Sequence, residues 1–252
     1  MTLWALEVEY DGTPFMGWQR QKHGLTVQEV MEQAAAKICA GVAPLAVAAG
    51  RTDAGVHALA QIVQMKLPEL SAQRLREALN HHMRPHPVVV LRAAAAPPGW
   101  NARFSAISRS YRYVISNRAA APAIAANRVW HVRQRLDAEA MQRAAQSLLG
   151  HHDFSSFRAS ACQAKSPLRT LDLLSVTRAG EDILVCAQAR SFLHHQVRNM
   201  VGALKMVGAG VWPESQIAVA LAARQRAAAG PTAPAQGLYL TGVGYAEPLA
   251  LS

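Results

Sequence analysis

The sequence predicts an α/β (α+β) fold of two similar halves, each combining strands with two helices in an antiparallel-rich arrangement. Apolar residues alternate between strand and helix periodicities along the 252-residue chain. A hydrophobic content of 51% in a chain of this length is enough to bury one large core or two small ones. The Ala/Pro-rich residues 93–99 form the clearest composition shift and divide the chain into halves of residues 1–98 and 99–252. We expect the functional cleft between these halves.

The first half begins with an expected strand over residues 3–10. Thr26 and Glu29 have the spacing of a capping box, which predicts a helix from Val27 with one apolar face. Strands are expected over 44–49 and 59–67. A second helix begins at Ser71, and a short strand covers 88–92.

In the second half, a strand over 108–117 places alternate residues, among them Arg109 and Tyr111, on one face. Asp137 can cap a helix that we expect to end at Gly150. The remaining elements are strands over 168–177, 183–191 and 238–245 and helices over 194–210 and 213–221. The Ala/Pro/Gly segment 227–236 and the loop 158–168 are expected to be mobile.

Several classes of protein are excluded by composition. No apolar run reaches the roughly 20 residues that a membrane-spanning helix needs, and the N-terminus lacks the basic flank of a secretion signal. Cys39, Cys162 and Cys186 have no paired spacing, which favours a reducing compartment over a disulfide or zinc scaffold. We therefore expect a cytoplasmic protein with no membrane contact.

The charge is concentrated in the second half of the chain. Residues 1–100 carry nine Lys and Arg against eight Asp and Glu, whereas residues 101–252 carry 17 against eight, and 15 of those 17 are arginine. Arginine suits bidentate phosphate contacts and stacking on bases. This asymmetry favours a polyanionic partner, most simply nucleic acid, over charge that serves only solubility or reflects an arginine-biased composition.

One stretch, residues 50–57 (Gly-Arg-Thr-Asp-Ala-Gly-Val-His), stands out between the two expected strands of the first half. Two glycines flank the carboxylate of Asp53, and Arg51 lies two residues before it. Glycine permits close ligand approach, and loops on a rigid sheet commonly display reactive side chains. From spacing alone, a glycine-punctuated surface loop with a local ion pair remains the slightly better interpretation.

With Ala58, this stretch resembles the signature loop of the tRNA pseudouridine synthase A family. Four further blocks resemble the same family in the same order: Tyr-Asp-Gly-Thr at 10–13 with the following turn at 15–21, Ser-Arg-Ser-Tyr-Arg-Tyr at 108–113, the run 192–202 and Gly-Leu-Tyr-Leu at 237–240. Together these blocks span nearly the whole chain. One block is a weak signal, whereas five in order are a specific one.

The resemblance implies two ferredoxin-like halves that form one extended, mostly antiparallel mixed sheet with flanking helices and an active cleft between the halves. It also implies a homodimer that isomerises uridine to pseudouridine at positions 38, 39 and 40 of the tRNA anticodon stem-loop. This reaction breaks an N–C glycosidic bond, turns the uracil over and rejoins it through carbon. Because no redox or phosphoryl-transfer step is involved, no cofactor and no metal are expected.

The reaction needs an ionised nucleophile, a group that stabilises it and a group that manages a proton. Asp53 fits the nucleophile, and the resemblance places it at the family's catalytic aspartate. Arg198 matches the aspartate's basic partner, which would favour the charged carboxylate. Tyr111 matches the active-site tyrosine, Leu238 matches an apolar residue that closes the pocket on the base, and Arg51 is a further candidate for gripping phosphate or the flipped nucleotide.

A uracil stacked in a stem must be flipped out before it can react, and phosphate contacts can offset the cost. The basic candidates for RNA binding are Arg103, Arg109, Arg112, Arg158, Lys165 and Arg169. Without the resemblance, each of them is equally well interpreted as a solvated surface charge. Tyr111, Arg198 and Leu238 would likewise be ordinary packing or surface residues.

Three His-His pairs, at 81–82, 151–152 and 194–195, lack the spaced Cys, His or carboxylate partners of a zinc site, and adjacent side chains are expected to point in different directions. We therefore expect no metal. Two other functions remain open from the residues: an RNA-binding protein without catalysis, which would tolerate loss of Asp53, and a metal-assisted hydrolase, which would lose activity in chelator.

Overall fold

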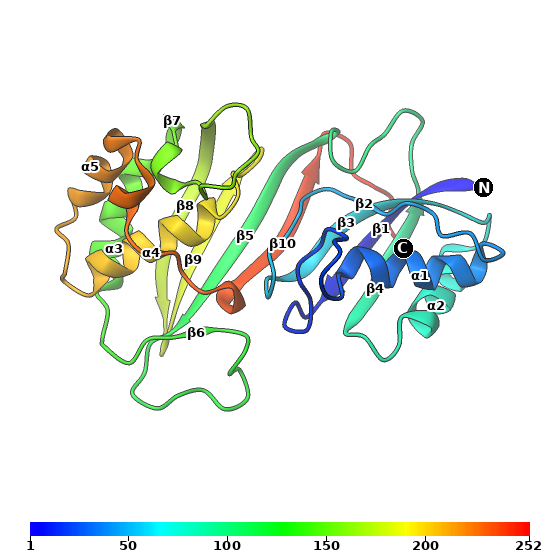
Figure 1. Ribbon diagram of the computed structural model, residues 1–252, viewed down its shortest axis with the longest axis horizontal. Helices are drawn as coiled ribbons and strands as arrows, with labels where there is room; N and C mark the ends of the chain where they lie inside the picture. The colour runs from blue at the N-terminus through cyan, green and yellow to red at the C-terminus, as the bar shows by residue number, and fades with distance from the viewer. The chain divides into compact units, whose positions relative to one another are not determined.

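The computed structural model describes all 252 residues and has a mixed α/β fold with a ten-stranded mixed sheet and five α-helices (Figure 1). The strands are β1 (Thr2–Tyr10), β2 (Val47–Ala48), β3 (His57–Leu67), β4 (Val88–Ala95), β5 (Ala106–Ser116), β6 (Trp130–His131), β7 (Gly150–Asp153), β8 (Leu168–Ala179), β9 (Asp182–Ala189) and β10 (Leu238–Tyr245). The α-helices are α1 (Val27–Ile38), α2 (Ala72–Met83), α3 (Ala138–Ala145), α4 (Gln196–Gly208) and α5 (Gln216–Ala223). The predicted fold class is confirmed.

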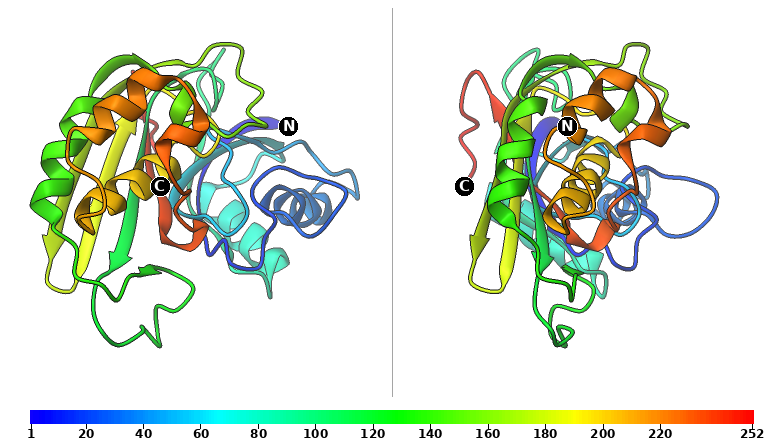
Figure 2. Two further views of the ribbon diagram at one scale, coloured as in Figure 1. Left: turned by 60° about the vertical axis from the view of Figure 1, so that its left-hand side comes forward. Right: turned by 90° about the vertical axis from the view of Figure 1, so that its left-hand side faces the viewer.

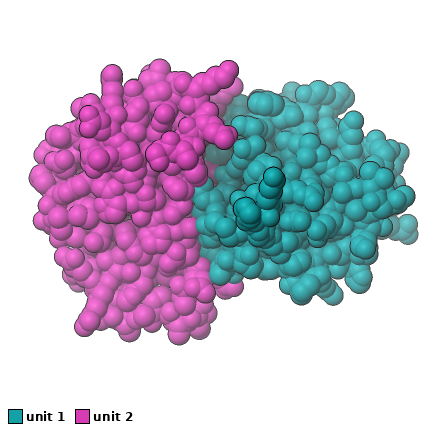
Figure 3. Space-filling model, in the orientation of Figure 1, with its two compact units in different colours: residues 1–109, 239–252 teal, residues 110–238 magenta.

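Two compact units make up the chain (Figure 3). Unit 1 contains residues 1–109 and 239–252, and unit 2 contains residues 110–238. The units meet in sequence within β5, and the C-terminal segment belongs to unit 1. The predicted division into halves of residues 1–98 and 99–252 stays a prediction, and its boundary falls earlier in the chain than the one between the units.

Unit 1 is built on β1, which pairs antiparallel with both β3 and β4. The last strand, β10, pairs parallel with β3 and aligns Tyr239 with His57. Helices α1 and α2 pack against each other, and α2 packs on β4. Thr26 caps α1 by accepting a hydrogen bond from the N–H of Glu29, as the capping-box spacing predicts, and Ser71 caps α2 by accepting from the N–H of Arg74.

Unit 2 is built on the antiparallel pairs β8–β9 and β7–β8, and its helices lie on one face of these strands (Figure 2). Helix α3 packs on both β8 and α4. The carboxylate of Asp137 accepts a hydrogen bond from the N–H of Ala140 at 2.9 Å, which confirms the predicted cap. The predicted end of this helix at Gly150 is wrong, because the α-helix ends at Ala145 and a 3₁₀ turn over Gln146–Leu148 precedes β7.

Other element boundaries agree with the sequence to within a few residues. The exception is β2, which covers only Val47–Ala48 of the expected 44–49. None of the five helices is both long and apolar enough to span a membrane.

Candidate active site

The loop that carries Asp53 joins β2 to β3 and is fixed at its first residue. Ala48 pairs with Val63, and the N–H of Ala49 donates to the carbonyl of Ile62 at 2.8 Å. The fully buried side chain of Gln61 holds the next residue, Gly50, by two hydrogen bonds. It donates to the carbonyl of Gly50 at 2.7 Å and accepts from the N–H of Gly50 at 3.4 Å. These hydrogen bonds hold the first two residues of the loop against β3 and so fix the direction in which the loop leaves the sheet.

Thr52 fastens the residue next to the carboxylate. Its buried hydroxyl lies 2.8 Å from the hydroxyl of Tyr10, and its carbonyl accepts from the N–H of Trp18 at 3.0 Å. Burial raises the pKa of Tyr10 to about 12, so this hydroxyl keeps its proton across the physiological range. Asp53 follows directly, half-buried, on a turn closed by the N–H of Val56 donating to the carbonyl of Asp53 at 3.1 Å.

Two glycines in the preceding turn allow the backbone to lie directly against this loop. A Cβ atom at Gly12 would lie 2.0 Å from the carbonyl oxygen of Val56. Gly17 has a φ of +90°, and a Cβ atom there would lie 2.7 Å from the carbonyl oxygen of Thr52. Residues 12–17 and 52–56 thus form one packed layer that only glycine permits at these two points.

His57, which sequence reasoning left unassigned, supports the same layer. Its ring is buried and stacks on Tyr239 with centroids 4.7 Å apart. Its Nδ1 lies 3.0 Å from the N–H of Gly12 and 3.1 Å from a carboxylate oxygen of Asp11. An unprotonated Nδ1 accepts from Gly12, and a protonated one donates to Asp11. In either tautomer His57 ties β3 to the glycine turn, while Arg51 on the loop itself is exposed.

The candidates for the basic partner and for base binding lie in unit 2: Arg198 on α4, Tyr111 on β5 and Leu238 at the start of β10. Nε of Arg198 donates to the carbonyl of Ala233 at 2.9 Å, and the N–H of Ala233 donates back to the carbonyl of Arg198 at 3.0 Å. The ring of Tyr111 meets Phe192 edge to face, with centroids 5.2 Å apart. Leu238 is 5% exposed. Arg198 is thus tied at Nε to the segment that leads to Leu238.

Residues 226–237, which contain the 3₁₀ turns Arg226–Ala229 and Ala235–Gly237, are docked onto α4. The buried Asn199 donates to the carbonyl of Phe157 at 2.8 Å and accepts from Thr232 at 2.6 Å and from Arg226 at 3.0 Å. Arg226 also donates to Thr232 and to the carbonyl of Gly230, each at 2.7 Å. We call Asn199, Arg226 and Thr232 the α4 clamp.

Close backbone contact reinforces the clamp. A Cβ atom at Gly202 would lie 1.9 Å from the carbonyl oxygen of Pro231, and the hydroxyl of Tyr113 donates to the carbonyl of Pro234 at 2.7 Å. Burial raises the pKa of Tyr113, with the nearby Arg198 acting in the opposite direction. The expectation that 227–236 is mobile is therefore wrong. Its Ala/Pro/Gly composition serves close packing against α4.

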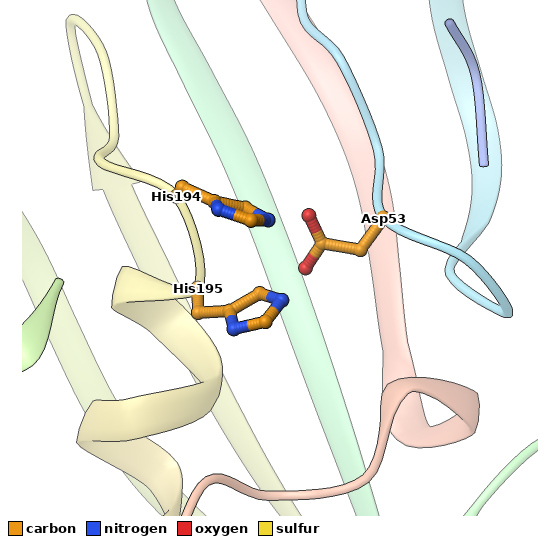
Figure 4. A group of neighbouring side chains, drawn as sticks. All are labelled: Asp53, His194 and His195. Carbon is orange, nitrogen blue, oxygen red and sulfur yellow. The ribbon is translucent and has the colours of Figure 1, made fainter. Parts of the chain in front are cut away.

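His194 and His195 immediately precede α4, and their rings lie side by side with centroids 4.0 Å apart. His195 has a φ of +63°, which turns the chain into the helix. Adjacent residues were expected to point in different directions, and for this pair the expectation is wrong because the left-handed backbone brings both rings to one side. Figure 4 draws both rings and the carboxylate of Asp53 with the segments that carry them.

The six basic RNA-binding candidates differ widely in exposure. Arg103 and Lys165 are exposed, while Arg112 and Arg158 are half-buried. Arg169 donates to the carbonyls of Ser166 and Leu168, and burial lowers its pKa.

Arg109 has a structural role in the sheet. Its guanidinium is buried and donates to the carbonyl of Ala49 at 2.7 and 3.2 Å, to that of Ala106 at 3.1 Å and to that of Arg103 at 2.6 Å. Ala49 is the first residue of the Asp53 loop, so Arg109 anchors that loop.

Sequence reasoning missed Gln61 and the α4 clamp, which hold the site in place, and named Arg109 only as a candidate for RNA binding. A fully buried Gln within an apolar strand is a signal for a polar tether, because buried amides need partners. The identity of those partners depends on residues distant in the sequence, as with Gln61 and Gly50.

A carboxylate on a braced loop, together with a second unit carrying 15 Lys and Arg against seven Asp and Glu, indicates an enzyme that acts on nucleic acid. Comparison with known proteins identifies the class of enzyme. A sequence model described as tRNA pseudouridine synthase matches residues 7–105 and 144–246.

Proteins called tRNA pseudouridine synthase A are similar over nearly the full chain. That of Acidiphilium cryptum (strain JF-5) is 62% identical over 97% of each chain. Those of Rhodospirillum centenum and Paramagnetospirillum magneticum are 56% and 57% identical over 97% of this chain, covering 100% and 96% of their own lengths. The chain belongs to the tRNA pseudouridine synthase family, and its activity is the isomerisation of uridine in tRNA.

The glycine turn gives a first prediction. Gly17→Ala forces a Cβ to within 2.7 Å of the carbonyl oxygen of Thr52 and should displace the Asp53 loop, lowering both the melting temperature and the rate of pseudouridine formation. Gly41→Ala is a matched control, because Gly41 has a similar φ of +85° but no atom lies within 4 Å of the place that its Cβ would take. It should cost only about 1 kcal/mol of backbone strain and leave turnover intact. Equal effects of the two variants would show that the close approach at Gly17 does not position the loop.

The α4 clamp gives a second prediction. Arg226→Ala leaves the buried Oδ1 of Asn199 with one donor fewer, and should lower the free energy of unfolding by about 1–3 kcal/mol and open residues 226–237 to proteolysis. Arg224→Ala is the control, since Arg224 is exposed and makes only a 3.6 Å ion pair with Asp153. Proteolysis of this segment that is no faster in Arg226→Ala than in Arg224→Ala would contradict the role assigned to the clamp.

Proposed function

We propose that this enzyme converts uridine to pseudouridine at positions 38, 39 and 40 of the tRNA anticodon stem-loop, with Asp53 as nucleophile and the target base flipped out of the stem. The observation that carries the proposal is the bracing of the Asp53 loop by Gln61, Thr52 and the two glycines. A nucleophile must be held in one geometry to react efficiently. The alternative, a surface loop with a local ion pair, would not need buried polar side chains that hold the loop on both sides of its carboxylate.

Arg198 is the proposed basic partner of Asp53. A carboxylate in a pocket with little water tends to take up a proton, and a fixed guanidinium opposes this by favouring the charged form. The hydrogen bond from Nε of Arg198 to the carbonyl of Ala233 supports the assignment, because it holds the guanidinium in a defined position.

Tyr111 and Leu238 are proposed to receive the flipped uracil. The ring of Tyr111 can stack on the base while its hydroxyl handles a proton, and the edge-to-face contact with Phe192 supports a defined ring orientation. Leu238 would close the pocket on the base, and Arg51 would grip the phosphate or the flipped nucleotide.

The proposed working species is a cytoplasmic homodimer in which one tRNA contacts both subunits. Three free cysteines are in keeping with a reducing compartment. The names of the relatives support tRNA as substrate, and the basic unit 2 supports binding to its phosphates. Because 226–237 is docked, reaching three neighbouring nucleotides would depend on movement of the RNA or of the loop 158–168.

The test of the nucleophile is Asp53→Asn. This change should abolish tritium release from tRNA carrying 5-tritiated uridine while largely sparing tRNA affinity, because one carboxylate performs the chemistry and many arginines bind. Asp172→Asn, at an exposed carboxylate on β8, is the control and should behave as wild type. Wild-type yield from Asp53→Asn, or loss of wild-type activity in chelator, would refute the proposed mechanism.

Target choice and assembly are tested by mapping pseudouridine on transcripts that carry uridine at 38, 39 or 40. We expect modification at more than one of these positions and a dimer in sedimentation. Modification confined to the D or T arm, or an active monomer, would contradict the proposal while leaving the isomerase activity in place.

Salt dependence separates phosphate-binding residues from structural ones. The logarithm of the binding constant should fall linearly with the logarithm of salt concentration, and Lys165→Ala should lower the slope by about one because Lys165 is exposed. Arg109→Ala should instead lower the free energy of unfolding, since the guanidinium of Arg109 donates to backbone carbonyls. A slope unchanged by Lys165→Ala would place the RNA elsewhere.

A further inference from the structure

The turn before β5 in unit 1 presents an aromatic side chain to solvent. Phe104 is 76% exposed, whereas most large apolar side chains of the unit are buried in the core. The guanidinium of Arg103, itself exposed, lies over the Phe104 ring with its carbon 5.6 Å from the ring centroid. The two side chains thus form one cationic, aromatic surface, and neither is used in the proposed reaction.

The turn that carries this surface is held rigidly. The side chain of Asn101 accepts from the N–H groups of both Arg103 and Phe104, at 2.9 and 3.0 Å, and the hydroxyl of Ser105 accepts from the N–H of Asn101 at 3.0 Å. The buried Arg109 donates to the carbonyl of Arg103 at 2.6 Å. The backbone that presents Phe104 is therefore fixed by side chains on both sides.

Ala102, which lies between Asn101 and Arg103, ties the turn to the rest of unit 1. Its N–H donates to the side chain of Gln64 at 2.6 Å, and its carbonyl accepts from the hydroxyl of Tyr245 at 2.7 Å. Ala102 is fully buried. Because Gln64 lies on β3 and Tyr245 ends β10, the exposed ring is fixed to the same strands that brace the Asp53 loop. Such preorganisation lowers the entropy that a ligand must offset when it binds.

The size and chemistry of this surface suit one nucleobase. A stable protein dimer buries about 800 Å² on each partner, whereas a single aromatic side chain offers about 150–250 Å². Proteins that bind unpaired nucleic acid stack bases on exposed aromatic rings and use neighbouring arginines for cation–π and phosphate contacts. Since the enzyme acts on tRNA, its own substrate supplies unpaired bases that could stack on this ring.

We propose that Phe104 and Arg103 form a stacking site for one unpaired nucleobase of the bound tRNA, separate from the uridine that reacts. The site adds a contact to the proposed function and rests on tRNA being the substrate. It does not rest on the choice of positions 38, 39 and 40.

The experiment measures equilibrium binding of a tRNA transcript and of a fully paired RNA duplex to the full-length protein. Phe104→Ala should weaken tRNA binding about 5- to 140-fold, equivalent to the 1–3 kcal/mol of one stacked base at 1.4 kcal/mol per tenfold, and should leave duplex binding unchanged. Phe104→Trp should restore affinity, whereas Phe104→Leu, which stays apolar but has no ring, should not. Ile124→Ala is the control for loss of an exposed apolar side chain, since Ile124 is 96% exposed.

Three results would overturn the proposal: tRNA affinity unchanged in Phe104→Ala, an equal loss for the duplex, or full affinity in Phe104→Leu. A loss of affinity that accompanies conversion of dimer to monomer in sedimentation would also overturn it and assign the surface to a second copy of the chain. Thermal melting of each variant checks the fold, which should hold because Phe104 is exposed. The readout is affinity and not modification, so failure here leaves the proposed target positions untouched.

Discussion

The position of Asp53 depends on how closely one stretch of backbone can approach another. Residues 12–17 lie so near to residues 52–56 that a methyl group at Gly12 or Gly17 would collide with a carbonyl oxygen of the loop. The contact then recruits polar partners: Thr52 pairs with Tyr10 and Trp18, and His57 meets Gly12 and Asp11. A loop that would otherwise be a mobile surface connection is anchored to the packed interior at Gly50 and at Thr52, the residue before the carboxylate.

Unit 2 uses the same means around Arg198. Gly202 lets the carbonyl of Pro231 lie against α4, and buried polar groups of the α4 clamp complete the contact. In both units a glycine allows main-chain contact, and a buried side chain satisfies the groups that the contact removes from water. Such sites are costly to disturb, since a polar group that loses its partner in the interior keeps its full desolvation penalty. Rigidity at each proposed reactive side chain thus follows from satisfying the interior around it.

The sequence predicts well those features that depend on neighbours in the chain. Thr26 and Asp137 cap the helices that their patterns predict, because a cap and its N–H partner are three residues apart. Features that depend on distant partners were mispredicted or missed. The Ala/Pro/Gly composition of 227–236 predicts mobility, but Asn199 and Tyr113 hold the segment from elsewhere in the chain. The α3 helix likewise ends early, at a 3₁₀ turn that its apolar stripe does not reveal.

The same distinction limits what net charge can say about RNA binding. The net charge of +10 includes Arg109, whose guanidinium donates to backbone carbonyls, and Arg226, whose guanidinium donates to Asn199 within the α4 clamp. Arg143 is likewise taken up by a bidentate contact with Glu214. An arginine that donates to backbone carbonyls adds charge to the sequence but has few donors left for phosphate. Basicity therefore identifies the kind of partner, whereas the contact surface must be found among exposed side chains, and there an aromatic ring such as Phe104 carries information that no count of charges contains.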